Sequence, residues 1–188
     1  MTKIAILASH NGSAFDALYE ASKNVLDIEI VLIITNNTDA NILQKAKSNT
    51  IDSYIINNKT YEDVDKKIYE LLQKYDCDMV FLAGYMKKIS SILTRNFTIL
   101  NSHPSLLPLY GGAGMYGRFV HEAVIKNNEK TSGVTIHKVN DNYDEGEVIL
   151  QKRITLNSNE TIESLEKRIK QLEQTTIVEA FEKLLHSS

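Results

Sequence analysis

The residues best suited to chemistry lie in the segment Asn101-Ser102-His103-Pro104-Ser105-Leu106-Leu107-Pro108, which directly follows a short apolar run. Pro104 and Pro108 are the only two prolines of the chain, and proline fixes φ. A loop stiffened in this way holds its side chains in fixed directions. Asn101 and His103 are therefore candidate catalytic residues, and a plain turn is the alternative interpretation.

A second candidate is the turn Asp141-Asn142-Tyr143-Asp144-Glu145-Gly146, which follows another apolar run. Turns rich in Asp, Asn and Gly usually have no further role. This turn, however, is expected to leave its strand at the end of the sheet where His103 also lies. A carboxylate there can meet the imidazole, and we predict that it raises the pKa of His103 and holds the orientation of the ring.

A third candidate is Ser9-His10-Asn11-Gly12-Ser13, which joins the first predicted strand to the first predicted helix. Backbone N–H groups at a helix N-terminus bind anions, and the helix dipole helps. The alternative interpretation is that Ser13 only caps the helix and Gly12 only makes the turn. The turn lacks the G-x-G-x-x-G spacing of a dinucleotide site, and its one glycine is compatible with a single phosphate.

The other titratable side chains have weaker claims. His137 lies inside a predicted strand and is expected to pack there or to support another site residue. His10, His121 and His186 have no partner at metal-ligand spacing, so no metal site is predicted. The single cysteine, Cys77, excludes an internal disulfide and has no recognisable base nearby in the sequence.

Short apolar runs alternate with amphipathic stretches along the whole chain. Two runs, residues 30–34 and 79–83, are continuous rather than alternating, as in strands that are covered on both faces. Strands separated by helices need crossover connections, which predicts an α/β fold with a doubly wound, mainly parallel open sheet. Ligands lie outside the carboxyl ends of such strands, which is where the three candidate loops fall. Strands are predicted at 4–8, 28–35, 53–56, 79–83, 98–100, 134–139 and 148–154, and helices at 13–23, 40–47, 61–74, 89–95, 120–127 and from 161 onwards.

The composition is that of an ordinary globular protein. The 188 residues suit one domain, with 43% hydrophobic and 24% charged residues. The 21 Lys and Arg against 24 Asp and Glu give a formal net charge of −3 without a dense basic cluster, so no nucleic-acid partner is expected. No apolar stretch approaches the ~20 residues of a membrane span. We therefore expect a cytoplasmic protein that binds small molecules and no membrane.

The candidate loops together resemble the glycinamide ribonucleotide formyltransferase family of folate-dependent enzymes, and the likeness covers nearly the whole chain. Any one of the motifs is weak, whereas four in the right order are strong. The four are the phosphate-binding turn Asn11-Gly12-Ser13, the folate loop Ala83-Gly84-Tyr85-Met86 with Ile89-Ser90, the hallmark Asn101-x-His103-Pro104-Ser105-Leu106-Leu107-Pro108, and Asp141-x-x-Asp144-x-Gly146 followed by Val148-Ile149-Leu150-Gln151.

This resemblance implies a Rossmann-like formyltransferase fold in a single domain, residues 1–188. It implies a phosphate-binding half at about 1–98 and a folate-binding, catalytic half at about 99–188. The implied catalytic residues are Asn101, His103 and Asp144. The implied contacts to the co-substrate 10-formyltetrahydrofolate are Lys59, Met86, Lys87, Lys88, Ile89, Asn101, Val139, Asn140 and Asp141. The implied contacts to the acceptor are Gly12, Ser13, Ala14, Lys170 and Glu173.

The implied activity is transfer of the formyl group of 10-formyltetrahydrofolate to the amino group of 5-phosphoribosylglycinamide in de novo purine biosynthesis. The implied enzyme is a monomer or homodimer that uses no metal. Asn101 and a protonated His103 are expected to donate to the oxyanion of a tetrahedral intermediate, while Asp144 assists proton movement. The family usually has Asn at Ala14 and often Gln at Lys170. Ala14→Asn is therefore expected to leave acceptor binding unchanged or to improve it.

Three alternatives stay open. A 10-formyltetrahydrofolate hydrolase uses similar residues with water as acceptor, but such enzymes carry an N-terminal regulatory domain, and the first strand here begins near Lys3. Formyltransferases that act on other amines, such as those of methionyl-tRNA or amino sugars, typically carry further domains. A non-catalytic phosphosugar-binding module would need Asn101, His103 and Asp144 only as turn residues, and their joint family spacing argues against it.

Overall fold

The computed structural model describes residues 1–186 and divides into two compact units, Met1–Asn101 and Ser102–Ser188. The strand β5 (Thr98–His103) carries the chain from the first unit into the second. Among the described residues, no helix is both long enough and apolar enough to cross a membrane.

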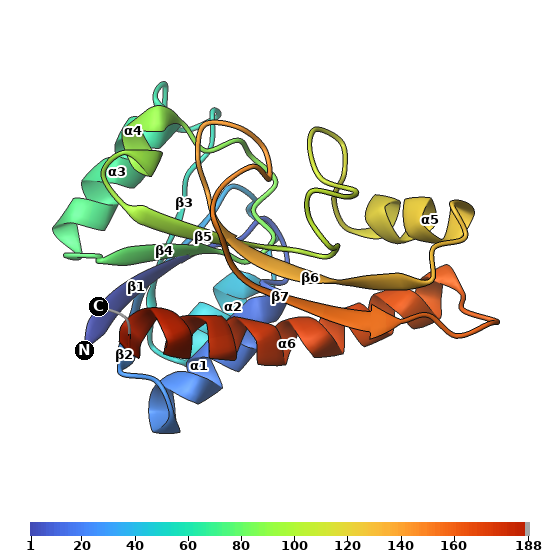
Figure 1. Cartoon of the computed structure of the whole chain (residues 1–188). Helices are drawn as coiled ribbons and strands as arrows, with labels where there is room; N and C mark the ends of the chain where they lie inside the picture. Colours follow the sequence, from blue (N-terminus) through green and yellow to red (C-terminus); the bar gives the residue numbers. More distant parts are fainter. Residues whose placement is uncertain (187–188) are drawn as a thin grey trace. The chain divides into compact units, whose positions relative to one another are not determined.

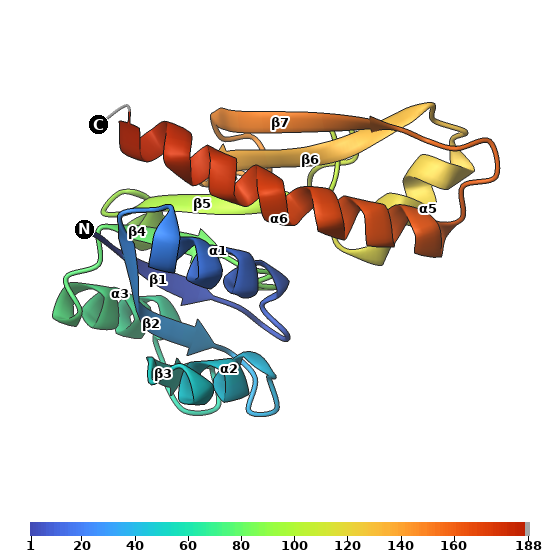
Figure 2. The same ribbon diagram turned by 90° about the horizontal axis from the view of Figure 1, so that it is seen from below.

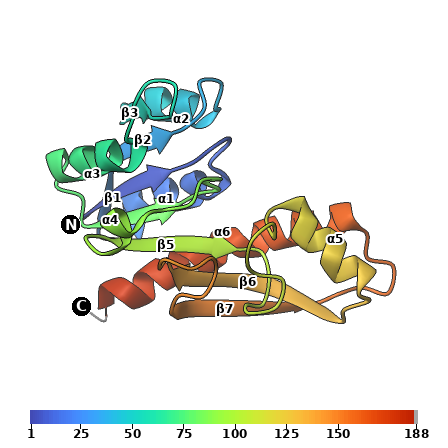
Figure 3. The same cartoon turned by 90° about the horizontal axis from the view of Figure 1, so that it is seen from above.

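Five parallel strands form the sheet of the first unit, in the order β3-β2-β1-β4-β5 (Figure 3). Ile6 of β1 lies opposite Ile33 of β2 and Phe81 of β4, and all three side chains are fully buried. This burial explains why the apolar runs are continuous, since helices cover both faces of these strands. The other strands of this sheet are β1 (Thr2–Leu7), β2 (Ile28–Thr35), β3 (Asp52–Ile55) and β4 (Met79–Leu82).

Helices lie on both faces of this parallel sheet (Figure 1). The helices α1 (Ser13–Asn24) and α2 (Ile42–Ser48) are on one side, and α3 (Val64–Lys74) and α4 (Ser91–Thr94) are on the other. Helix α3 begins where the Asp63 carboxylate accepts the backbone N–H of Lys66 at 3.0 Å, a regular N-cap. The predicted doubly wound, mainly parallel α/β fold is confirmed.

The second unit combines an antiparallel hairpin with two helices. Strand β6 (Thr131–Lys138) pairs with β7 (Val148–Thr155), and α6 (Ile162–His186) packs on both strands and on α5 (Arg118–Lys126) (Figure 2). The periodic apolar side chains of α6 provide this contact, because they are buried while the charged side chains between them are not. The turn after β6 therefore follows a strand that is paired with β7 and covered by α6.

Every predicted strand and helix is present, but β5 is longer than predicted. It continues past residue 100 to His103, so Asn101 and His103 are strand residues and not loop residues. Alternate residues of a strand point to the same face, so these two side chains share a face of β5. The end of β5 was predicted too early because these side chains are polar, and a polar run usually indicates a loop.

Candidate active site and ligand-binding residues

His103 is buried, with only 3% of its surface exposed, and both of its ring nitrogens face oxygen atoms. Its Nε2 lies 2.7 Å from the carbonyl oxygen of Tyr110, and its Nδ1 lies 3.5 Å from Oδ2 of Asp144. The first distance is a good hydrogen bond, whereas the second is at the outer limit, so Asp144 acts on the ring mainly through its charge. Two acceptors around one ring suit the imidazolium form, in which both nitrogens donate.

Asp144 lies between two imidazoles. Its Oδ1 is 3.5 Å from Nε2 of His137, and its Oδ2 accepts the backbone N–H of Gly112 at 2.9 Å. Burial alone would raise the pKa of Asp144, but His137, the charge of His103 and the Gly112 N–H outweigh it and lower that pKa. Asp144 is therefore ionised at neutral pH.

The predicted proximity of Asp144 to His103 is confirmed, but the predicted rise of the His103 pKa is wrong. Burial has the largest influence on this imidazole and lowers its pKa. The charge of Asp144 and the carbonyl of Tyr110 act in the opposite direction without compensating, and His137 lowers the pKa further. The charge partner was visible in the sequence, whereas the depth of burial was not.

Of the predicted acceptor contacts, Glu173 has a side-chain hydrogen bond to a residue of β5. This half-buried carboxylate of α6 accepts a hydrogen bond from Oγ of Ser102 at 2.5 Å. Burial raises the pKa of Glu173 in spite of Ser102 and Lys170, which both lower it. Lys170 itself is exposed, and its Nζ lies 2.7 Å from the carboxylate of Glu166 on the same helix, so its charge is already paired.

The turn Gly12-Ser13-Ala14 lies at the N-terminus of α1. Gly12 is the N-cap with φ +56°, and a Cβ there would come within 2.5 Å of Cδ1 of Ile42, so the turn needs glycine. The interpretation of Ser13 as the cap is wrong, because Ser13 is the first helical residue and no side chain caps α1. Ala14 is 2% exposed, so an Asn there would have to bury its amide. The expected effect of Ala14→Asn on acceptor binding stays a prediction, and the burial adds a cost in stability.

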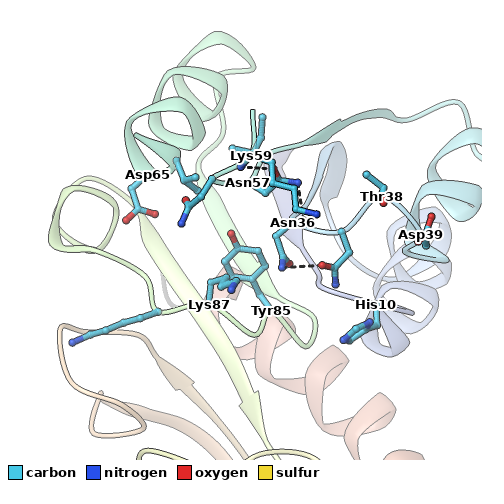
Figure 4. Close-up of a pocket in the computed structure, with 14 residues that line it drawn as sticks. His10, Asn36, Thr38, Asp39, Asn57, Lys59, Asp65, Tyr85 and Lys87 are labelled. Atoms are coloured by element: carbon cyan, nitrogen blue, oxygen red, sulfur yellow. Dashed lines mark hydrogen bonds between the residues drawn. The ribbon is translucent and has the colours of Figure 1, made fainter. Parts of the chain in front are cut away.

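A cavity of about 750 Å³ lies at the carboxyl ends of β1 to β4, inside the first unit (Figure 4). Lys59, Lys87 and Lys88, the three lysines expected to contact the folate, all line it. The loops after β1 and β4 leave neighbouring strands toward opposite faces, which is the usual position of ligand sites in doubly wound sheets. The remaining lining residues are His10, Asn36, Asn37, Thr38, Asp39, Ile56, Asn57, Asn58, Val64, Asp65 and Tyr85.

Ser9 joins the loop after β1 to the loop after β4. This fully buried hydroxyl accepts the backbone N–H of Met86 at 2.7 Å and donates to Oδ1 of Asn36 at 2.6 Å. The backbone of Ser9 also donates to the carbonyl of Gly84 at 3.1 Å and accepts from Nδ2 of Asn37 at 2.6 Å. The loop that contains Met86 is therefore held at two points by one residue.

The other predicted folate contacts differ in how accessible they are. Met86 is 45% exposed, whereas Ile89 is 4% exposed and its side chain belongs to the core of the first unit. In the second unit, Val139 directly follows β6 and is half-buried, and Asn140 and Asp141 are exposed on the turn. These positions leave Met86, Asn140 and Asp141 as the side chains that a ligand can reach without rearrangement.

Residues 2–181 match a protein family described as "Formyl transferase". The chain belongs to the formyl transferase family.

Relatives of known name support this membership. The chloroplastic phosphoribosylglycinamide formyltransferase of Arabidopsis thaliana is 38% identical over 184 residues, which are 94% of this chain and 63% of that protein. This chain therefore spans less than two thirds of the plant relative. The phosphoribosylglycinamide formyltransferase of Bacillus subtilis (strain 168) is 32% identical over 98% of this chain and 95% of its own. A crystal structure of phosphoribosylglycinamide formyltransferase from Bacillus halodurans has 31% identity and a TM-score of 0.89, covering 98% of this chain and 95% of that one. The formyltransferase fold is confirmed.

Two residues of the candidate site around His103 were missed or given too little weight in the sequence. Tyr110 contacts His103 through its backbone carbonyl, and such a contact leaves no signal in the residue type. His137 was expected to pack or to support another residue, and the structure places it against Asp144. Its position near the end of the strand that leads into the Asp144 turn was the available signal. Within residues 1–186, no three His, Cys, Asp or Glu side chains are grouped so as to hold a metal ion.

Proposed function

We propose that this chain transfers the formyl group of 10-formyltetrahydrofolate to the amino group of 5-phosphoribosylglycinamide in purine biosynthesis, as one formyltransferase domain over residues 1–188. The observation that carries this proposal is the buried His103–Asp144 pair, preceded on the same strand by Asn101, in a member of the formyl transferase family. The names of several relatives support the choice of acceptor.

The reaction needs a site that stabilises an oxyanion and moves one proton. The acceptor nitrogen forms a bond to the formyl carbon, and the carbonyl oxygen takes up the displaced electron pair. That pair then re-forms the carbonyl as the bond between carbon and the folate nitrogen breaks. One proton passes from the acceptor nitrogen to the leaving folate nitrogen, so atoms and charges balance.

Asn101 and His103 supply donors for the developing oxyanion, and each such donor is typically worth ~3 kcal/mol. The negative oxygen favours the imidazolium form of His103, as Asp144 does, and so offsets the burial that lowers the pKa of this ring in the free protein. Asp144 then assists the transfer of the proton between the two nitrogens. No covalent nucleophile is needed for this sequence of steps.

Each unit contains its own set of proposed binding residues. In the first unit, N–H groups of Gly12, Ser13 and Ala14 bind the acceptor phosphate at the start of α1, where the helix dipole favours an anion. Three lysines around the cavity, Lys59, Lys87 and Lys88, match the carboxylates of a folate tail. Met86 and Ile89 are the further folate contacts proposed in this unit. In the second unit, Glu173 and Lys170 contact the acceptor, and Val139, Asn140 and Asp141 contact the pterin. A cytoplasmic location and a monomeric or homodimeric state remain predictions.

The deciding experiment is an assay of the purified protein with 10-formyltetrahydrofolate, with and without 5-phosphoribosylglycinamide. We expect donor consumption only with this acceptor, and a formylated acceptor by mass spectrometry. Equal consumption without any amine would identify a hydrolase, and consumption only with other amines would identify a different formyltransferase. Binding of the phosphosugar without any consumption would identify a non-catalytic module.

A pair of histidine variants provides the control. His103→Asn should reduce turnover at least about 10²-fold, because it removes a donor to the oxyanion. His186→Asn should leave turnover unchanged, since His186 is an exposed residue at the end of α6. Equal turnover of the two variants would contradict the proposed active site.

A further inference from the structure

We propose that Tyr110 is a positioning residue, whose backbone carbonyl fixes the His103 ring and whose phenol is clamped so that this carbonyl stays in place. The inference rests on the proposed function, because His103 is the imidazole that serves the oxyanion. It extends that function by assigning the two ring nitrogens to different tasks.

The two ring nitrogens of His103 have contacts of different length, and this assigns them different tasks. Nε2 of His103 donates to the Tyr110 carbonyl at 2.7 Å, whereas Nδ1 stands 3.5 Å from the Asp144 carboxylate. The short bond orients the ring, and the long contact supplies charge without a good hydrogen bond. Since Nε2 is committed to Tyr110, the proton that can be shared with the oxyanion is the one on Nδ1.

The backbone of Tyr110 needs support to hold this geometry. Its φ of +56° lies in the left-handed region, which is unfavourable for an aromatic residue. The phenol Oη of Tyr110 donates to Oε1 of Glu129 at 2.6 Å and accepts from Nδ2 of Asn127 at 2.9 Å. Both partners lie just after the end of α5, so this clamp, formed by the Tyr110 phenol with Glu129 and Asn127, joins the loop after β5 to that helix. The hydroxyl of Ser105 further fixes the start of this loop by donating to the carbonyl of Leu109 at 2.5 Å.

The groups that face the His103 ring come from three elements. Asp144 lies on the turn after β6, His137 lies on β6, and His121 on α5 interacts with the ring electrostatically. None of these is a phenol partner of Tyr110. A change in the Tyr110 clamp reaches Nε2 of His103 directly through the Tyr110 carbonyl. It can reach Nδ1 only indirectly, through Gly112 and Asp144, so the Nε2 signal is the readout that tests the inference.

The test is Tyr110→Phe, which removes the hydroxyl but keeps the aromatic ring. The matched control is Tyr75→Phe in the first unit. There the phenol donates to Oδ2 of Asp52 at 2.6 Å and lies 2.9 Å from Oη of Tyr54, so the same substitution removes two contacts of the same lengths. The two variants should lose similar stability in urea unfolding. Only Tyr110→Phe should disturb His103.

For Tyr110→Phe we expect a fall of about tenfold in kcat with little change in either KM, because a displaced catalytic group affects the transition state more than binding. The alkaline limb of the kcat–pH profile, where the active imidazolium of His103 loses its proton, should move to lower pH, since a loosened carbonyl favours the charged ring less. In ¹⁵N NMR of the free protein, the Nε2 signal of His103 should move. Tyr75→Phe should change none of these three quantities.

Replacement of the clamp partner gives a second, independent comparison, which also applies if Tyr110→Phe does not fold. Glu129→Ala should reproduce the loss seen with Tyr110→Phe, and Glu129→Gln, which keeps an acceptor oxygen, should retain activity. The double variant Tyr110→Phe/Glu129→Ala should be no worse than either single one, because both remove the same bond.

The inference is overturned if Tyr110→Phe and Tyr75→Phe have the same kcat and the same His103 signals. It is also overturned if Glu129→Ala and Glu129→Gln are equally active and leave the Nε2 signal unmoved. The NMR readout needs no turnover, so it tests the role of Tyr110 even if the protein does not formylate 5-phosphoribosylglycinamide. The absence of formyl transfer by the wild type would refute the proposed function alone.

Discussion

Asp144→Asn removes one negative charge from the His103 centre and keeps the shape of the side chain. The Gly112 N–H donates to Oδ2 of Asp144, so the amide oxygen of the Asn takes that place and its NH₂ group faces Nε2 of His137. Nδ1 of His137 lies 2.9 Å from the Lys138 carbonyl and donates to it, so Nε2 accepts from the amide. The variant can therefore fold without an unsatisfied polar atom at this position.

The magnitude follows from the distance between the two charges. At an effective dielectric constant of about 20, unit charges at the 3.5 Å that separate Nδ1 of His103 and Oδ2 of Asp144 interact by about 5 kcal/mol, an upper bound because both charges are spread over several atoms. We expect turnover to fall about 10²-fold, which corresponds to about 2.7 kcal/mol and lies within that bound. Burial already lowers the pKa of His103, and removal of the Asp144 charge should lower it further.

Single-turnover kinetics and an NMR titration of His103 measure these two effects. The interpretation is refuted if both the rate and the His103 pKa stay unchanged in Asp144→Asn, as they would if Asp144 were an ordinary turn residue. Urea unfolding gives an independent check of the sign. The pKa of Asp144 is lowered by folding, so its stabilising effect is present above its unfolded value of about 4 and is lost as the pH falls through the lower folded value. The wild type should thus exceed Asp144→Asn in stability at pH 7 and lose this advantage in acid.

Three further predictions concern stability, and the first two also concern binding. Ser9→Ala removes a buried hydroxyl and leaves the part-buried N–H of Met86 without its acceptor, which should cost about 1–3 kcal/mol in urea unfolding and raise the KM for the folate. An unchanged KM would contradict the role of Ser9 in holding that loop. Glu173→Gln should stabilise the protein at neutral pH, because the pKa of the folded carboxyl is raised and its contribution to stability is lost as the pH rises through that value. Acceptor affinity, measured by calorimetry, should fall, and an unchanged affinity would show that Glu173 is not part of the acceptor site. Gly146→Ala would place a Cβ 1.7 Å from a carbonyl oxygen of β6 and should cost at least about 2 kcal/mol. The cost should exceed that of Gly114→Ala, where a Cβ meets nothing within 4 Å and only the left-handed φ of +84° opposes the substitution, and thermal unfolding of both variants decides this.

Most of the fold could be predicted from the sequence because its apolar runs are long and its helices amphipathic. The strand β2 was predicted at the residues where it occurs, since eight consecutive strand-forming residues stand between clear breaks. The end of β5 was not predicted. The last three residues of β5 are polar, and their types do not favour a strand locally: Asn101, Ser102 and His103. Local sequence preference is expected to fail at functional sites in this way.

The site could be predicted in part, and the limit has a physical basis. The contact of His103 with Asp144 follows from residue types at the carboxyl ends of two strands, His103 as the last residue of β5 and Asp144 on the turn after β6. Burial and backbone geometry do not follow in this way. The lowered pKa of His103 depends on packing from several elements, and the capping of α1 by Gly12 depends on a left-handed backbone that also suits a plain turn.

The residue that orients the His103 ring and the residue that favours its charge share an unusual backbone conformation. Tyr110 and Asp144 both adopt left-handed backbone conformations, at φ +56° and +57°, although neither is glycine. Such conformations cost of order 1–3 kcal/mol each and persist only where the surroundings fix them. Here the Glu129 contact fixes the first, and the Gly112 N–H fixes the second. The free energy gained by packing elsewhere in the second unit must therefore exceed the cost of both strained residues. The two strained conformations place the Tyr110 carbonyl near Nε2 of His103 and the Asp144 carboxylate near Nδ1, and both oxygens favour the charged form of a ring whose pKa burial lowers.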